Sequence, residues 1–311
     1  MRPRLTLPLR RASKDRWLRR IAELDPERDH HEIYRISASY EFPWDYQRSL
    51  ELALFKTYCV PSISALLDAT GEFRDRPQQR YDDTALLMAE IADHGYDSER
   101  GREALRVINR AHGRYAISND DMRYVLSTFV YEPIDWLDRF GWRPLTDAER
   151  LAAFHFYREV GHRMGIRDVP PDFEGFRRLK DEYERDTFRF SETNRRLGTY
   201  TLELLASWYP RPLRPAARLA VRGFLDEPML TAFGFAPAPS WLPPVERAAL
   251  RARAAVVRRL PPRKVSVLAG PASDNRTYPG YPQGYRPADL GAPPPPADLD
   301  PRWLNRRGAG R

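Results

Sequence analysis

Apolar residues recur along this chain mostly at intervals of three and four residues, the spacing of one face of an α-helix. In the stretch 77–93, one such face holds Arg80, Asp83, Thr84, Leu87, Met88 and Ile91. The alternation of apolar and polar residues that is typical of strands is nearly absent. We therefore predict an all-α protein, with helices over residues 13–24 (capped by Ser13), 28–38, 44–69, 77–93, 146–164, 172–190, 192–208, 213–223 and 244–260.

Capping and helix-breaking residues set the expected helix boundaries. The apolar stretch 44–69 predicts a buried helix that breaks near Pro61 and stops at Gly71. Asp97–Ser98 is expected to cap a helix that carries Leu105, Ile108, Ala111 and His112 on one face. Ser118, Asn119 and Asp120 form an N-cap cluster for the next helix, which we expect Pro133 to kink or end.

Proline marks the end of the helical region. Eleven of the 29 prolines lie between Pro261 and Pro301, a composition that favours extended, irregular chain. We expect an irregular basic tail over residues 1–12, a single multi-helix domain over 13–262 and a Pro-rich tail over 263–311. The aromatic residues through which this tail could wrap the helical body are Tyr278, Tyr281, Tyr285 and Trp303.

The net charge of +8 on 311 residues lies mainly at the two ends. Residues 1–20 carry +7 and residues 302–311 carry +4, which leaves a charge of −3 between them. Nucleic-acid-binding proteins usually carry their positive charge on a folded face. We therefore expect no nucleic-acid partner.

Composition also restricts the compartment. The most apolar stretch, 50–67, contains Glu51 and Lys56, so we expect no transmembrane segment. Residues 1–25 are basic and lack the apolar core of a secretory signal. The single cysteine, Cys59, excludes a disulfide framework. A cytoplasmic protein is expected, and its oligomeric state is left open.

Two inward-facing positions could carry chemistry. His112 shares a face with apolar residues, so its imidazole could be a haem ligand or simply a core histidine with a backbone partner. Arg80 and Thr84 lie one helical turn apart on another apolar face. An inward arginine needs an anion, which could be a haem propionate or a nearby acid such as Asp82 or Asp83. Thr84 could bond a bound water, dioxygen or substrate.

A non-haem metal site is the main alternative. Glu159 and His162 are three residues apart on one helix with His155 nearby, and Glu27 and His30 repeat that spacing. Paired Glu-x-x-His motifs are typical of di-iron carboxylate proteins. Cys59 could ligate haem as a thiolate, although a packed free thiol fits its apolar surroundings better.

Several stretches resemble the MpaB-type oxygenase family, which includes the rubber oxygenase called latex-clearing protein. The resemblance covers roughly residues 20–265, and its motifs are YEFPWD (40–45), RYDDT (80–84), NRAHGRY (109–115), ISNDDMRYVLSTFVYEP (117–133) and REVGHRMGI (158–166). It implies a globin-related fold that binds haem b, with His112 as proximal iron ligand and Arg80 and Thr84 in the pocket. Asp83 stands where latex-clearing protein has a lysine that can occupy the distal iron position, so the resemblance does not extend to the distal arrangement or to rubber as the substrate.

The resemblance also implies an activity. A member of this family would use dioxygen to oxidise a small apolar substrate, for example by cleaving a double bond in an isoprenoid-like chain. Asp83 could then act as a base or an orienting acceptor, or it could be a surface acid beside Arg80. The rivals are a di-iron oxidase built on Glu159 and His162, and a non-enzymatic haem-binding helical protein.

Overall fold

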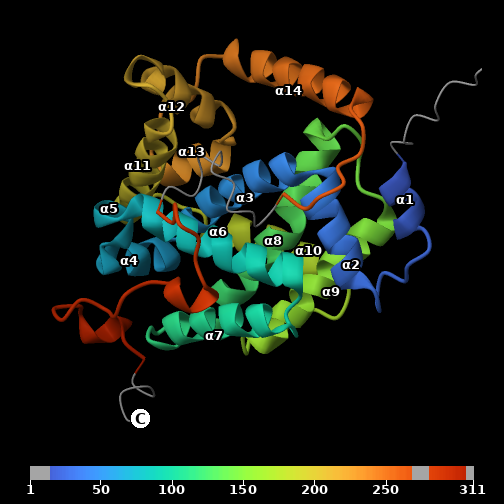
Figure 1. Ribbon diagram of the computed structural model, residues 1–311. Helices are drawn as coiled ribbons and strands as arrows, with labels where there is room; N and C mark the ends of the chain where they lie inside the picture. The colour runs from blue at the N-terminus through green and yellow to red at the C-terminus, as the bar shows by residue number, and fades with distance from the viewer. Residues whose placement is uncertain (1–14, 268–279, 306–311) are drawn as a thin grey trace, which may run out of the picture.

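The computed structural model describes residues 15–267 and 280–305, which form one helical body (Figure 1). No β-strand forms within these residues, so the all-α prediction is confirmed. The helices are α1 (Arg16–Ile21), α2 (His30–Arg35), α3 (Pro43–Tyr58), α4 (Pro61–Thr70), α5 (Glu72–Asp75), α6 (Pro77–His94), α7 (Glu99–Gly113), α8 (Asn119–Phe140), α9 (Asp147–Arg163), α10 (Phe173–Thr187), α11 (Glu192–Ser207), α12 (Arg214–Gly223), α13 (Glu227–Phe233) and α14 (Leu242–Arg259).

Most helix boundaries lie where the local sequence signals place them. The apolar stretch divides at Pro61 into α3 and α4, whose axes differ by 97°. Gly71 ends α4 in the left-handed conformation (φ 73°), which glycine adopts without steric cost. The side chains of Ser98 and Ser118 accept hydrogen bonds from backbone N–H groups in the first turns of α7 and α8. The cap candidate Ser13 and the basic tail 1–12 lie outside the described residues.

Helix α8 corrects one of the two expectations at Pro133, namely that the helix ends there. The helix does not end there but continues to Phe140. A proline removes one helical hydrogen bond and disfavours the preceding turn. Here Pro133 is buried, and α8 packs against α3, α9 and α10, so tertiary contacts support the helix despite that loss. The short helices α5 and α13 and a π-helix over Ile36–Glu41 are further features that periodicity does not predict.

Among the described residues the core consists of three apolar clusters, and the two larger ones bear on the site. The larger one includes Tyr34, Leu126 and Phe156 from α2, α8 and α9, together with residues of α6 and α7. The smaller one includes Phe55 of α3 and Phe233 of α13, with residues of α11. These two clusters come together around a cavity that is lined by α3, α4, α6, α7 and α8, and this arrangement positions the site.

Two lysines and two glutamates that lie between α3, α8 and α10 form ion pairs with one another. Lys180 and Lys56 each contact both Glu132 and Glu184, with Nζ–O distances between 2.8 and 3.1 Å. The side chain of Lys180 is only 2% exposed. These four groups join α3, α8 and α10, and their pairing compensates for the cost of burying charge.

Among the described helices, none is by itself long and apolar enough to cross a membrane. The bent pair α3 and α4 reaches the required length and composition only when the two helices are counted together.

The C-terminal segment 280–305 lies against α6 and α7 (Figure 1). The Tyr281 hydroxyl donates to Asp83 at 2.5 Å, and the Tyr285 hydroxyl donates to Glu90 at 2.8 Å. Tyr278, the third tyrosine expected in this contact, lies outside the described residues. The segment has only the short 3₁₀ turns Pro287–Asp289 and Pro301–Trp303, in keeping with its proline content.

Candidate functional site

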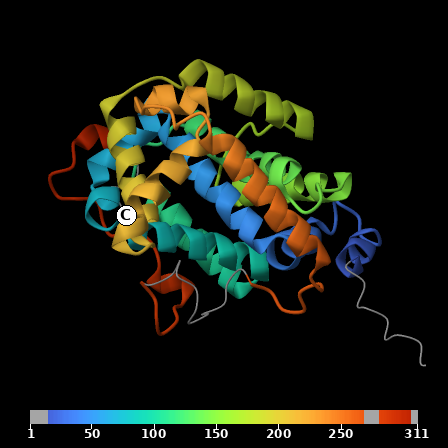
Figure 2. The same cartoon turned by 90° about the horizontal axis from the view of Figure 1, so that it is seen from above.

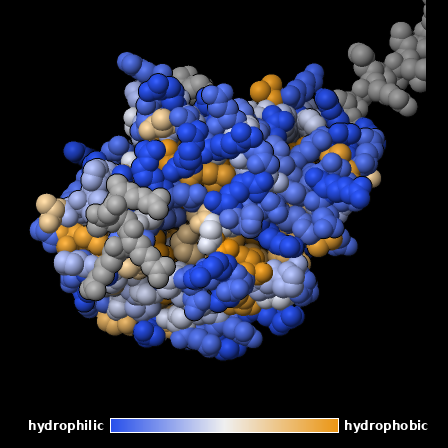
Figure 3. All heavy atoms as spheres, turned by 90° about the horizontal axis from the view of Figure 1, so that it is seen from below, coloured by the Kyte–Doolittle hydropathy of each residue, from blue (hydrophilic) through white to orange (hydrophobic). Residues whose placement is uncertain are grey.

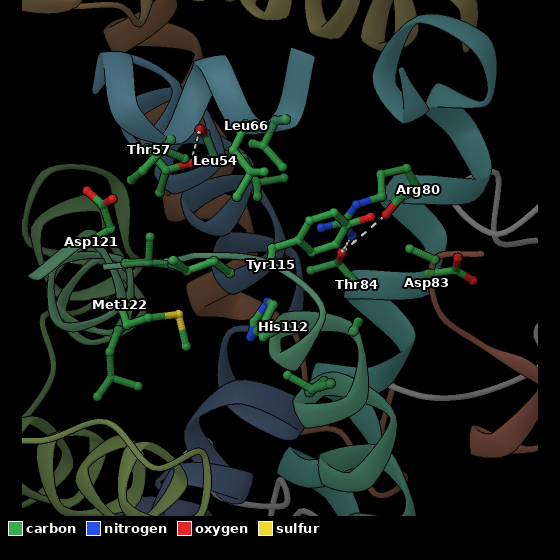
Figure 4. A pocket seen from close by; sticks show the side chains of 18 of the residues that line it. Leu54, Thr57, Leu66, Arg80, Asp83, Thr84, His112, Tyr115, Asp121 and Met122 are labelled. Atoms are coloured by element: carbon green, nitrogen blue, oxygen red, sulfur yellow. Dashed lines mark hydrogen bonds between the residues drawn. The ribbon is translucent and has the colours of Figure 1, made fainter. Parts of the chain in front are cut away.

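A cavity of about 410 Å³ lies between the helices (Figure 4). Its walls are mostly leucine, isoleucine, valine, methionine and aromatic side chains. Figure 3 views the molecule from below Figure 1 and shows apolar side chains at the surface around a hollow. A mostly apolar cavity of this size, with a few polar groups on its wall, is typical of cofactor and substrate sites.

His112 forms part of the cavity wall from the last turn of α7. Its Nδ1 atom is buried and has no hydrogen-bond partner in the described part of the chain. Burial, with a smaller contribution from the positive charge of Arg80, lowers the pKa of His112 to about 4. The imidazole is therefore neutral at neutral pH, which leaves a nitrogen lone pair for a metal ion.

Arg80 enters the cavity from α6, as predicted from helical spacing. Its guanidinium donates to the Thr84 hydroxyl and lies 5.6 Å from the centre of the Phe73 ring. In the ranges 15–267 and 280–305 it forms no ion pair. The alternative that Arg80 pairs with Asp82 or Asp83 is therefore not realised in these ranges, and its charge can bind an anion in the cavity.

The two neighbouring acids have other partners. Asp82 accepts hydrogen bonds from the side chain of Gln78 and the backbone N–H of Gly280. Asp83 borders the cavity and is only 3% exposed. Its carboxylate accepts the hydrogen bond from the Tyr281 hydroxyl. Figure 4 shows this carboxylate turned away from His112. The structure thus places Asp83 at the attachment of the C-terminal segment.

The C-terminal segment also closes part of the cavity. Gly291, Ala292 and Trp303 belong to its lining. Arg114 holds the segment by donating to the carbonyl oxygens of Ala292 and Pro293 at 3.1 and 2.9 Å. The region expected to be an irregular tail therefore supplies one wall of the site.

Several further residues, which are not among the predicted site residues, line the cavity. The Tyr58 hydroxyl is buried at the cavity and has no partner among the described residues, and burial raises the pKa of this phenol. Tyr115 lies one turn after His112, and Figure 4 shows its ring between His112 and Arg80. Asp121 accepts hydrogen bonds from Ser62 at 2.9 Å and from a tyrosine of α10 at 2.5 Å. The spacing of Tyr115 from His112 is the one sequence signal that could have identified it. Placing Tyr58 and Asp121 at the cavity requires the tertiary structure.

The alternative metal ligands do not form a site in the described residues. Glu159 pairs with Arg163 at 2.6 Å, and Nε2 of His30 hydrogen-bonds the Tyr96 hydroxyl at 2.5 Å. No group of three or more His, Cys, Asp or Glu side chains there could hold a metal ion. Cys59 is fully buried and donates weakly to the carbonyl oxygen of Phe55, as a packed thiol would.

The fold and site define an all-α protein with an apolar cavity that carries a neutral histidine and an arginine without an ion pair among the described residues. Comparison with known proteins identifies its family. Residues 47–259 match the family described as "ER-bound oxygenase mpaB/B'/Rubber oxygenase, catalytic domain", and the chain belongs to it. The resemblance seen in the sequence is therefore confirmed.

Three fungal relatives show the extent of the similarity. The "ER-bound oxygenase mpaB'" of Penicillium brevicompactum is 29% identical over 257 residues, which cover 76% of this chain and 60% of the relative. The "ER-bound oxygenase mpaB" of Penicillium roqueforti (strain FM164) is 34% identical over 155 residues, 47% of this chain and 52% of the relative. The "ER-bound oxygenase mpaB" of Penicillium brevicompactum is 33% identical over 154 residues, which cover 47% of this chain and 39% of the relative. The chain thus spans between 39% and 60% of the length of these relatives.

Proposed function

We propose that this chain is a haem b-dependent oxygenase that uses dioxygen to oxidise an apolar substrate. Membership of an oxygenase family supports the reaction class. The observation that carries the cofactor assignment is His112, whose buried Nδ1 has no partner among the described residues and whose ring faces the cavity. A buried polar atom without a partner is rare in proteins, and a metal ion bound to Nδ1 would give this nitrogen a partner.

The residues around the cavity fit a haem group. The cavity volume of about 410 Å³ lies within the range of roughly 300–1,000 Å³ that is usual for cofactor sites. Apolar walls suit a porphyrin ring, and Arg80 offers a cation for a propionate. When bound, the haem iron would supply the oxygen-activating chemistry.

The protein residues would set ligation, orientation and access. A ring nitrogen of His112 would hold the iron, and Arg80 would bind a carboxylate by charge-assisted hydrogen bonds. The Thr84 hydroxyl, next to that guanidinium, would orient an oxygen-containing ligand. Tyr115 and Trp303, which line the cavity, would help to exclude water from it.

An alkene with an isoprenoid-like chain suits the apolar part of this cavity, and oxidative cleavage of its double bond is the reaction we propose. The substrate would be held mainly by burial of apolar surface, because the cavity offers few polar groups. Dioxygen, itself apolar, would enter the same space.

Absorption spectroscopy of protein supplied with haem tests the cofactor. The wild-type chain should show a Soret band, and His112→Ala should lose or shift it. His162→Ala, an exposed histidine of α9, is the matched control and should leave the spectrum unchanged. A His112→Ala spectrum identical to that of the wild type would refute the assignment of His112.

Two further readouts separate the rival functions. Oxygen consumption in the presence of an apolar alkene is expected from the haem-loaded chain; haem binding with no consumption on a panel of such alkenes would favour a sensing or binding protein. Iron retained without haem, and lost in Glu159→Ala, would favour the di-iron oxidase.

A further inference from the structure

Helix α14 carries apolar side chains on the side that faces solvent. Trp241, Val245 and Val256 are 59%, 54% and 58% exposed. Each residue along this side has another one three or four positions away, so together they form one continuous row. We call this row the α14 stripe; it consists of Trp241, Val245, Ala248, Ala249, Ala252, Ala255, Val256 and Leu260, all of them exposed.

A row of cations runs beside the α14 stripe. Arg247, Arg251 and Arg258 are exposed and spaced four and seven residues apart, and we call them the arginine row. The one acid of α14, Glu246, lies on the inner side of the helix, where its carboxylate approaches Gly223. The solvent side of α14 therefore combines apolar surface with positive charge and carries no acidic side chain.

This part of the chain is also the basic part of the body. Residues 207–267 carry a net charge of +8, whereas residues 21–206 carry −9. The charge of −3 between the basic ends conceals this division. A cationic surface beside an acidic one orients a protein toward anionic partners.

Helix α14 is attached to the body along its inner side only. Leu242 and Ala254 are its buried residues, and it contacts α12 and α8. Figures 1 and 2 show the helix lying across the outside of the bundle, with no described element over its outer side. No α14 residue belongs to the cavity lining, so this surface is separate from the proposed active site.

We propose that the outer side of α14 docks on an anionic membrane surface. Helices that lie in a membrane interface combine an apolar side, often with tryptophan, and flanking arginine or lysine that contacts lipid phosphates. The α14 stripe would enter the headgroup region, and the arginine row would meet the phosphates. A second copy of the chain fits less well, because two-fold pairing on this face would bring two arginine rows into one interface.

Vesicle sedimentation tests the proposal. The full chain is mixed with vesicles of 70% phosphatidylcholine and 30% phosphatidylglycerol, or with phosphatidylcholine alone, at 100 mM NaCl. Binding is expected to the anionic vesicles and should weaken as salt rises. Reversing the arginine row to glutamate should lower the partition coefficient at least tenfold, since each basic residue near an anionic membrane strengthens binding roughly fivefold.

Matched variants distinguish this face from general attraction by net charge. The control for the arginine row is Arg102→Glu, Arg106→Glu and Arg110→Glu, which makes the same change of charge on exposed positions of α7. The control for Val256→Asp is Leu151→Asp, at an exposed leucine of α9. Both α14 variants should lose binding, whereas both controls should retain most of it.

Three results would overturn the proposal. The first is no binding of the wild type to anionic vesicles, and the second is an equal loss with the α7 control, which would mean that net charge alone drives binding. The third is a concentration-dependent dimer that Val256→Asp abolishes, which would make α14 a protein–protein interface. Circular dichroism of each variant checks that the helical content is unchanged.

Discussion

The attachment of the C-terminal segment to α6 allows a quantitative test of how the cavity is closed. The Tyr281 hydroxyl donates a 2.5 Å hydrogen bond to the buried carboxylate of Asp83, across 198 residues of sequence. Tyr281→Phe removes this bond and the hydroxyl's hydrogen bond with Gln79, whereas the aromatic ring is kept. We therefore expect the substitution to act mainly on local opening of residues 280–305.

The size of the effect follows from burial. A hydrogen bond to a charged group contributes about 1.5–3 kcal/mol to stability. Asp83 is only 3% exposed, so its carboxylate would lose the Tyr281 donor in a buried position. A loss of about 2 kcal/mol corresponds to a roughly 30-fold larger equilibrium constant for opening. Because Asp83→Ala removes the same bond, the double variant should cost less than the sum of the two single variants.

Native-state hydrogen exchange measures this opening directly. Amides of 280–292 should exchange about 30 times faster in Tyr281→Phe, while those of α9 should be unaffected. The control is Tyr209→Phe, at an exposed tyrosine for which no hydroxyl hydrogen bond is found in the described residues. Since Gly291, Ala292 and Trp303 line the cavity, a ligand bound there should also dissociate faster. Unchanged exchange in 280–292 would refute the view that the Tyr281–Asp83 bond holds the segment.

Three further predictions concern stability. Lys180→Met should lower the free energy of unfolding by about 3–5 kcal/mol, measured in urea, because Glu132 loses one of two buried cations; Lys264→Met, at an exposed lysine, should change it by less than about 0.5 kcal/mol. Burial raises the pKa of Glu246 to about 7, so its carboxyl destabilises the fold as pH rises from about 4.5 to 7; Glu246→Gln should therefore be more stable than wild type at pH 8 and not at pH 5. For His112 the pKa is lowered to about 4, so the unfolded chain takes up this proton first and stability falls as pH decreases from about 6.5 to 4; an apo His112→Phe chain should lack this component of the pH dependence. An identical pH profile for wild type and either variant would contradict the corresponding pKa shift.

Local sequence signals determine most of the helices. Apolar spacing predicts the long helices, Pro61 separates α3 from α4, and Gly71 ends α4, because these signals act within one or two helical turns. The same spacing places His112 and Arg80 on inward faces, and both reach the cavity. Composition also separates the helical body from its Pro-rich C-terminal segment, whose tyrosines contact α6.

The tertiary structure decides everything that depends on contacts distant in sequence. Helix α8 continues through Pro133 because neighbouring helices support it, although a proline at this position also allows the helix to end. Asp83, which spacing places beside Arg80, instead bonds Tyr281. Tyr58 of α3 and Trp303 of the C-terminal segment both line the cavity, and no local sequence pattern predicts that these two elements meet there. Side-chain partners across 100 or more residues depend on how helices pack, and helix packing is a property of the whole body rather than of any one stretch.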